Sequence, residues 1–402
     1  MRIAVLGAGL QGSCIALELA RRGVEVDLLD RADSPMTGAS VHNEGKVHLG
    51  YVYANDPTRR TARTMIGGAL EFGPLLRSWL GDDLDDVRRA APFYYLVHRD
   101  SLLDVAEVER HFADCHTIAL ELLDGREPDY FGGDPRIPPR RLSPAESAAD
   151  FDPATVLAAY ATSELAVEPG SLGVVVRRAR ARTPGIRLRT GTEVRAVTRL
   201  ADSALVHTDR SDDRYDHVVN ALWDGRLAID ETAGIVTERP WLYRMKYFLR
   251  LGPTAPVPST TIMLGPFGDV VTYDDGTVFL SWYPSGRRGT SAELHPPDWP
   301  TELDGALAKE VRAGIVEGLA DLVPAVATLP AAALDDSRVL GGVIFAHGHT
   351  DIDDPASVLH ERHEIGPSSH GHYHSVDTGK LTMAPRFARL VVERILAVEG
   401  SS

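Results

Sequence analysis

The sequence contains few cysteines and no long apolar run. Only Cys14 and Cys115 occur among 402 residues, which excludes a disulfide framework and a zinc site made of cysteine alone. We therefore expect a reducing compartment, the cytoplasm. No apolar stretch approaches the roughly 20 residues that cross a bilayer, so no transmembrane segment is expected. Met1 and Arg2 lead directly into a short apolar stretch, and we expect no signal peptide.

Basic charge is also scarce. The chain has 42 Lys and Arg against 57 Asp and Glu, and this net charge of −15 argues against a nucleic-acid partner or an anionic membrane surface. The composition, 44% hydrophobic and 25% charged, is that of a globular protein rather than a disordered or coiled-coil chain. The length accommodates two or three domains.

The first thirty residues predict a strand–helix–strand unit. Residues 3–6 are apolar and end at a glycine, residues 10–22 carry apolar side chains at helical spacing, and residues 24–29 predict the next strand, which ends at Asp30. Two strands joined by a helix indicate a parallel sheet with a right-handed crossover.

The turn inside this unit has the spacing of a dinucleotide-binding site. Gly7, Gly9 and Gly12 form G-x-G-x-x-G between the strand and the helix. The helix start offers free N–H groups to a pyrophosphate. Asp30 follows the second strand, where a carboxylate accepts hydrogen bonds from ribose hydroxyls. The motif alone does not distinguish a nicotinamide from a flavin dinucleotide.

The remaining chain alternates between helical and strand patterns. Residues 243–251 and 277–283 alternate between apolar and polar side chains, and Gly and Pro interrupt the sequence between them. This pattern indicates strands of an antiparallel sheet and hence a second domain. Residues 124–146, rich in Pro, Gly and charge, are expected to be irregular. Helices are expected at 61–80, 101–118, 171–182, 303–322 and 385–398, and further strands at 93–97, 186–197 and 215–221.

Three later segments carry a family resemblance. They are residues 39–51, residues 167–172 with the strand around 191–194, and residues 375–385. Together with the N-terminal unit, over about half of the chain, they resemble the D-amino-acid oxidase-like (DAO) family of FAD-dependent oxidoreductases. Residues 48–80 are most similar to the L-2-hydroxyglutarate oxidases of that family.

The resemblance implies an α/β fold, with a Rossmann-like FAD-binding domain and a second domain built on an antiparallel sheet. It implies a discontinuous FAD-binding domain and a substrate-binding domain between its parts. The activity implied is oxidation of a C–N or C–OH bond of a small polar substrate, either an amino acid or amine or a 2-hydroxy acid, by hydride transfer to flavin N5, with oxygen or another electron acceptor reoxidising the flavin. The boundaries expected are 1–85, 150–230 and 335–402 for the FAD-binding domain, and 86–149 and 231–334 for the substrate-binding domain.

The resemblance also implies which residues contact FAD. The loop over residues 40–50 would follow the pyrophosphate and the flavin ring, and the last helix would begin near Pro385 and direct its dipole at the flavin C2 carbonyl. His48 would lie beside the ring, either bonded covalently or hydrogen-bonded. The residues expected to bind FAD are Gly7, Gly9, Leu10, Gln11, Gly12, Asp30, Arg31, Ser40, Asn43, Gly45, Lys46, His48, Val194, Gly379, Lys380 and Leu381.

One strand of the second domain supplies candidates for binding the substrate. Arg244, Lys246 and Arg250 share a strand face with Phe248. This face is either solvated or a clamp for a carboxylate or phosphate, and a basic patch in an acidic protein favours an anionic substrate. We expect Arg244 or Lys246 to face the flavin.

Seven histidines lie between His347 and His374. A metal site is one interpretation, but no matching Cys/His framework accompanies them, so we expect no metal. We expect these histidines to line the cavity, with His372 handling a proton, and surface polarity is the alternative interpretation for His360 and His363. A hydroxy substrate needs a base, for which His48 or a late histidine is the candidate, whereas an amine needs only to be neutral. The catalytic candidates are His48, Lys246, Arg244 and His372.

Three other functions share parts of this pattern. A nicotinamide-dependent dehydrogenase shares the first thirty residues but leaves residues 40–51 and 375–385 unexplained. A flavin monooxygenase and a flavin-binding protein without oxidase turnover share the N-terminal unit. No Ser/His/Asp or Cys/His arrangement stands in a motif context, so a hydrolase is not supported.

Overall fold

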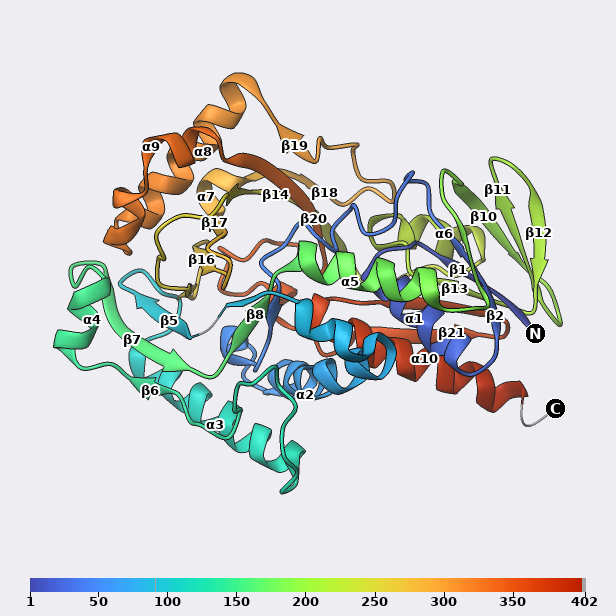
Figure 1. The fold of residues 1–402 in the computed structure, drawn as a ribbon, viewed down its shortest axis with the longest axis horizontal. Helices are drawn as coiled ribbons and strands as arrows, with labels where there is room; N and C mark the ends of the chain where they lie inside the picture. Colours follow the sequence, from blue (N-terminus) through green and yellow to red (C-terminus); the bar gives the residue numbers. More distant parts are fainter. Residues whose placement is uncertain (91, 400–402) are drawn as a thin grey trace.

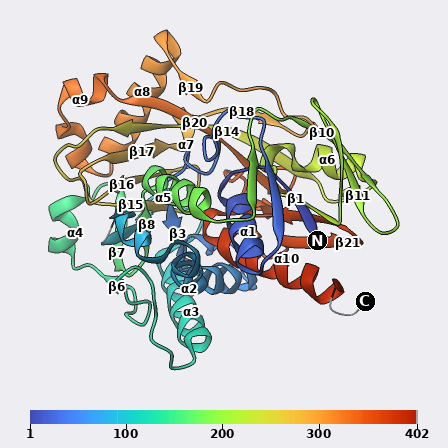
Figure 2. The ribbon, with the colours of Figure 1, turned by 45° about the vertical axis from the view of Figure 1, so that its right-hand side comes forward.

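Two large β-sheets organise the chain, which the computed structural model describes over residues 1–90 and 92–399. One sheet has six strands and the other has ten (Figure 1). Helices α8 (Gly305–Ala320) and α9 (Ala331–Asp335) lie with the larger sheet, and α1 (Leu10–Arg21) and α10 (Ala384–Glu399) with the smaller one. The turned view in Figure 2 keeps these two groups of helices on opposite sides of the molecule.

The six-stranded sheet is almost entirely parallel. Its order is β21 (Gly366–His370), β22 (Tyr373–Asp377), β13 (His217–Asn220), β1 (Arg2–Leu6), β2 (Glu25–Leu29) and β9 (Ile186–Arg189). Only β21, at the edge, runs antiparallel to its neighbour. The sheet therefore combines strands from the beginning, the middle and the end of the chain.

Both faces of this sheet are buried. Ile3 and Val5 of β1 belong to the core shared with the helices, whereas Ala4 and Leu6 pack on the opposite face. A helix layer covers the first face, and a three-stranded sheet covers the second. The helices are α1, α2 (Arg60–Leu80), α5 (Pro169–Arg182) and α10, and the covering strands are β10 (Val194–Arg199), β11 (Ala204–Thr208) and β12 (Asp212–Tyr215). Burial on both faces explains why β1 is an unbroken apolar run.

The ten-stranded sheet is mixed, with mostly antiparallel neighbours. Its order is β19 (Glu302–Leu303), β20 (Arg338–His347), β14 (Trp241–Leu251), β17 (Val278–Trp282), β16 (Gly268–Thr272), β15 (Thr260–Met263), β5 (Phe93–His98), β7 (Val156–Thr162) and β6 (Arg140–Arg141), with β18 (Arg287–Ser291) paired to β14. On one face, Met245 and Leu249 of β14 pack with Ile315 of α8. On the other face, Phe248 joins the core of the six-stranded unit.

Smaller elements connect the two sheets. A three-stranded sheet of β3 (Lys46–Val47), β8 (Leu165–Val167) and β4 (Arg89–Ala90) joins the loop after β2 to the start of α5. The other helices are α3 (Val105–Leu123), α4 (Pro144–Asp150), α6 (Arg226–Thr232) and the short α7 (Tyr283–Gly286).

The expected domain boundaries and the membership of the two large sheets differ at two strands. Strands β7 and β20 fall in the ranges 150–230 and 335–402, which were expected in the FAD-binding domain, but both belong to the ten-stranded sheet. The reason is strand pairing, since β7 pairs with β5 and β20 pairs with β14 over ten residues. Residues 124–146 also contain β6 and the start of α4. Within residues 1–90 and 92–399, no helix combines the length and the apolar character needed to cross a membrane.

Candidate functional site

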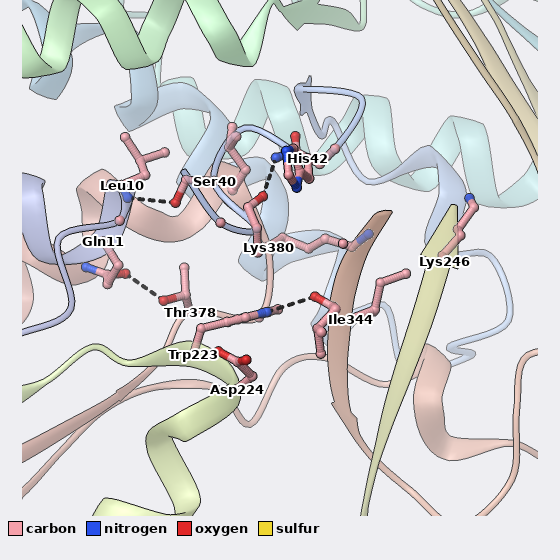
Figure 3. Close-up of a pocket in the computed structure, with 18 of the residues that line it drawn as sticks. Leu10, Gln11, Ser40, His42, Trp223, Asp224, Lys246, Ile344, Thr378 and Lys380 are labelled. Atoms are coloured by element: carbon pink, nitrogen blue, oxygen red, sulfur yellow. Dashed lines mark hydrogen bonds between the residues drawn. The ribbon is translucent and has the colours of Figure 1, made fainter. Parts of the chain in front are cut away.

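A cavity of about 1130 Å³ lies between the two sheets. It exceeds the range of about 300–1,000 Å³ that is usual for small-molecule pockets. Its lining comes from the start of α1, the end of β2, the loop over residues 36–48, the connection from β13 to α6, the inner face of β14 and the segment 378–384. Figure 3 shows side chains from these elements converging on one space.

The glycine turn forms one end of this cavity. Gly7 has φ +95°, and a Cβ there would lie 2.7 Å from the Ala221 carbonyl oxygen. A Cβ on Gly9 would lie 2.8 Å from Ser40 Oγ, which accepts a hydrogen bond from the Leu10 N–H (Figure 3). The backbone of β1, β13 and the loop after β2 can approach one another this closely only because glycine stands at both positions.

Gly12 does not line the cavity. A Cβ on Gly12 would lie 1.8 Å from the Gly7 carbonyl oxygen, so this glycine permits α1 to pack against the turn. Gly45 is also absent from the lining, because it lies against β8, where a Cβ would come within 1.8 Å of the Val167 carbonyl oxygen. The expectation that Gly45 provides a contact inside the cavity is therefore wrong.

Asp30 lies at the carboxyl end of β2, on the cavity wall. Its carboxylate accepts hydrogen bonds from the N–H groups of Ala8 (2.7 Å) and Ala32 (2.9 Å). The neighbouring Arg31 lines the same region, is largely exposed and lies 3.7 Å from Asp224. Val194 of β10 completes this end of the cavity.

The loop after β2 is held by its own side chains. Asn43 donates from Nδ2 to the Ala39 carbonyl (2.8 Å) and accepts from the Gly45 N–H (2.7 Å). Lys46 reaches across to the ten-stranded sheet, where Nζ donates to Thr261 Oγ1 (2.7 Å) and pairs with Asp269 (2.8 Å). These carboxylate contacts outweigh burial and raise the pKa of Lys46, so this lysine is a charged link between the two units.

His48 is buried beside a carboxylate that the sequence did not reveal. Its Nδ1 lies 3.7 Å from Oε1 of Glu164, and its backbone N–H donates to Thr382 Oγ1 (3.1 Å). Glu164 also accepts from the Leu49 N–H (2.6 Å) and from the Tyr95 hydroxyl. Burial lowers the pKa of His48, and Glu164 opposes that shift, so the imidazole is neutral at physiological pH.

The segment before α10 closes the cavity from the other end of the chain. Gln11 accepts from Thr378 Oγ1 (3.1 Å; Figure 3). It also donates to the Ala384 carbonyl (3.1 Å), and these contacts tie the start of α1 to the start of α10. Gly379, Lys380 and Leu381 line the cavity between these contacts. Burial lowers the pKa of Lys380 to about 8.

The basic side chains of strand β14 lie in two different places. Arg244 and Lys246 line the cavity, which is the position that a clamp for a carboxylate or phosphate requires. Arg250 lies outside it, where its guanidinium pairs with Glu168 at the start of α5. Of the three basic residues on this face, Arg250 therefore does not join the other two in the cavity, because it stands too far along the strand.

The late histidines are mostly remote from the cavity. Of the seven between residues 347 and 374, only His360 lines it. His372 precedes β22, and its Nδ1 contacts the Asp216 carbonyl (2.9 Å) at the amino end of the sheet. Its expected place in the cavity is wrong, because the cavity lies beyond the carboxyl end of β22. Residues 1–90 and 92–399 contain no group of three or more His, Cys, Asp or Glu arranged to hold a metal ion.

Other lining residues were not anticipated. His42 and His295 reach the cavity, and His42 Nδ1 is buried without a hydrogen-bond partner among the described residues. Trp223 adopts φ +58° and donates from its indole N–H to the Val343 carbonyl (2.8 Å), bridging β13 and β20 (Figure 3). A tryptophan after a strand has no sequence signal for this role.

Comparison with known proteins decides the family. The model of the DAO family, described as FAD dependent oxidoreductase, matches residues 2–394. The chain belongs to the DAO family of FAD-dependent oxidoreductases. The expected fold class, cofactor and enzyme class are thereby confirmed, and FAD is the cofactor of this DAO enzyme.

Solved structures of similar fold cover nearly the whole DAO chain. Glycine oxidase from Geobacillus kaustophilus is 16% identical, with a TM-score of 0.67 over 98% of this chain and 94% of that one. L-proline dehydrogenase from P. horikoshii is 18% identical, with a TM-score of 0.68 over 98% and 92%. L-alpha-glycerophosphate oxidase from Mycoplasma pneumoniae, with FAD bound, is 15% identical, with a TM-score of 0.64 over 97% and 93%.

Curated relatives match a short part of the chain. The tRNA 5-methylaminomethyl-2-thiouridine biosynthesis bifunctional protein MnmC of Chromohalobacter salexigens is 41% identical over 78 residues. That segment is 19% of this chain and 10% of the relative. The corresponding protein of Marinobacter nauticus is 42% identical over 65 residues, or 10% of its own length.

The residues of the DAO cavity fit FAD. The cavity is long enough to join the glycine turn to the inner face of β14, and it places backbone without Cβ atoms at Gly7 and Gly9. Two buried ring nitrogens, His42 Nδ1 and His48 Nδ1, lack a hydrogen-bond partner among the described residues. A glycine cradle at one end and unsatisfied polar atoms further along are what an elongated dinucleotide requires.

Proposed function

We propose that this enzyme oxidises a C–N or C–OH bond of a small anionic substrate, an amino acid, another amine or a 2-hydroxy acid, by hydride transfer to flavin N5. One observation carries the proposal. Arg244 and Lys246 line the cavity on the inner face of β14, and Lys246 has no ion pair within 4 Å among the described residues. A half-buried ammonium without an ion pair in an acidic protein favours an anionic ligand.

The names of the structural neighbours support the C–N alternative. They are a glycine oxidase, an L-proline dehydrogenase and an iminodiacetate oxidase, whose named substrates each carry an amine and a carboxylate. The L-alpha-glycerophosphate oxidase supports the C–OH alternative, again with an anion on the named substrate. The anionic group is common to both.

The proposed cofactor contacts follow the cavity from end to end. Asp30 would accept hydrogen bonds from the ribose, and the N–H groups at the start of α1 would hold the pyrophosphate with Ser40 and Asn43 beside it. Arg31 and Val194 would flank the adenosine, and Lys46 and His48 would lie toward the ring. When bound, FAD supplies the acceptor for the hydride. Residues 379–381 would place backbone and the Lys380 ammonium near the ring.

Proton handling is assigned to His48. Burial holds this imidazole neutral, so it can accept a proton from a hydroxyl group, and Glu164 at 3.7 Å from Nδ1 stabilises the protonated form. An amine substrate needs only to enter in its neutral form, and His48 then orients it. The Glu164 carboxylate is in turn fixed by the Leu49 N–H and the Tyr95 hydroxyl.

An anaerobic screen tests the proposal. The FAD-loaded protein is mixed with amino acids, other amines and 2-hydroxy acids, and the loss of yellow absorbance is recorded. Bleaching by an anionic member of the panel, followed by recovery on admitting oxygen or an artificial acceptor, is expected. Bleaching by a reduced nicotinamide dinucleotide, added without any of these substrates, would indicate a monooxygenase. No bleaching by any compound would indicate a flavin-binding protein without turnover.

A further inference from the structure

The segment between β20 and β21 closes the substrate side of the cavity. Ile352, Leu359, His360 and Arg362 from this segment line the space that Arg244 and Lys246 also reach. The segment is fastened by Asp351, whose side chain is only 7% exposed.

Asp351 occupies a complete carboxylate-binding site. Its Oδ1 accepts hydrogen bonds from Arg244 Nη1 (2.9 Å) and the Tyr283 hydroxyl (2.8 Å). The Ile352 N–H donates to the same oxygen (2.7 Å). Its Oδ2 accepts from Arg287 Nη1. Arg244 and Arg287 lower the pKa of Asp351, so the side chain is an anion.

Basic side chains surround Asp351, and one of them has a hydrogen-bond donor without a partner among the described residues. Arg244 is 2% exposed and its Nε has no hydrogen-bond partner among the described residues. The Lys246 ammonium lies 5.4 Å from the centre of the Tyr283 ring, and Arg287 lies 5.6 Å from the same centre. Three cations therefore converge on the Tyr283 side chain, and Asp351 pairs with two of them, Arg244 and Arg287. Asp353 lies 4.0 Å from Arg287, and the carboxylates that act on Lys246 are Asp269 and Glu44.

We infer that Asp351 determines substrate specificity by standing in the place of the substrate carboxylate, so that an anion reaches Arg244 and Tyr283 only by displacing it. This inference rests on the proposed oxidation of an anionic substrate. After displacement, Asp351 remains paired with Arg287, whose side chain is about one-third exposed and can move toward solvent together with Asp351. Arg244 then exchanges one carboxylate for another, whereas a neutral molecule would leave a buried guanidinium unpaired.

Binding of acetate tests the inference without turnover. Acetate and its neutral counterpart acetamide are titrated into the FAD-loaded protein, and the visible spectrum of the flavin reports occupancy. Asp351→Asn removes the competing charge and is expected to bind acetate at least tenfold more tightly than wild type. Asp353→Asn is the matched control, because Asp353 is half exposed and 4.0 Å from Arg287; its affinity for acetate should stay within twofold of wild type. Equal or weaker acetate binding by Asp351→Asn would overturn the inference.

A second measurement uses the wild-type protein, so it does not depend on folding of a variant. Hydrogen exchange is followed with and without saturating acetate. Exchange of the Ile352 amide, which donates to Asp351, is expected to rise when acetate is present. Saturation with acetate and no change in exchange over residues 348–365 would overturn the inference.

The two proposals fail separately. If both acetate experiments succeed and no anionic substrate bleaches the flavin, the proposed oxidation is wrong and the carboxylate site stands. If an anionic amine or hydroxy acid is oxidised and Asp351→Asn gains no affinity for acetate, the oxidation stands and the role of Asp351 is wrong.

Discussion

Replacing Asp30 by alanine tests the placement of the cofactor. The Asp30 carboxylate accepts from the N–H groups of Ala8 and Ala32 at 2.7 and 2.9 Å, which links β2 to the glycine turn. Water reaches this half-buried carboxylate and can replace both bonds in part, so the apoprotein should lose only about 1 kcal/mol of stability.

The loss is larger when FAD is bound. Ribose hydroxyls that donate to a carboxylate form charge-assisted bonds, and their removal costs about 1.5–3 kcal/mol. Each 1.4 kcal/mol is a tenfold change in the dissociation constant, so Asp30→Ala should weaken FAD binding roughly tenfold to a hundredfold. Asp30→Asn retains an acceptor without the charge and should lie between alanine and wild type.

The assay titrates apoprotein with FAD and follows flavin fluorescence, while urea unfolding of the apoprotein measures the smaller structural effect. Asp33→Ala is a suitable control, because Asp33 is exposed in the same loop and does not line the cavity. If Asp30→Ala retained FAD as tightly as wild type, the ribose would lie elsewhere.

Three other expectations follow from the contacts described. Gly45→Ala places a Cβ against the Val167 carbonyl at φ +70°, and urea unfolding should show a loss of about 2–4 kcal/mol; unchanged stability would mean that the loop packs differently. Lys246→Met should raise the KM for an anionic substrate about tenfold to a hundredfold more than for a neutral analogue, whereas Arg250→Met should leave that ratio unchanged; equal effects would place both residues outside the site. Burial lowers the pKa of His111 to about 4, below the value of about 6.5 for the unfolded chain, so its stabilising contribution is complete above pH 6.5 and declines by up to about 1.4 kcal/mol per pH unit toward pH 4. His111→Leu should flatten the dependence of stability on pH over that range, and a slope equal to that of wild type would contradict this assignment.

The parts of the site that the sequence predicted are those built from neighbours along the chain. Gly7, Gly9 and Asp30 belong to one strand–turn–helix–strand unit, whose geometry follows from local conformation and one parallel pairing. The residues of the segment before α10 were predicted from the family resemblance, and Gly379, Lys380 and Leu381 line the cavity.

The errors concern distance along a strand. Arg244 and Arg250 share a face, but six residues at about 3.3 Å each separate them by roughly 20 Å, which exceeds the width of a small substrate site. His372 stands at the wrong end of β22 for the same reason. The face that a side chain occupies is readable from alternation, but its position along the strand depends on register with partners that the sequence does not identify.

Glu164 and Asp351 were missed for another reason. Each is a single carboxylate in a segment without a motif, and its importance lies in being buried against groups more than 60 residues away along the chain. Only the tertiary structure reveals that a charged side chain has been removed from water.

The two contacts of Gln11 have a consequence for biosynthesis. Thr378 and Ala384 hold this side chain, and β22 joins the sheet beside β13, so the cofactor chamber is assembled from segments as far apart along the chain as Gln11 and Thr378, which are separated by 367 residues. A growing polypeptide that has completed the glycine turn still lacks the wall formed by residues 378–384. Stable binding of FAD should consequently require that residues 378–384 have left the ribosomal exit tunnel. Ribosome-bound chains stalled before that point should bind no FAD and be colourless.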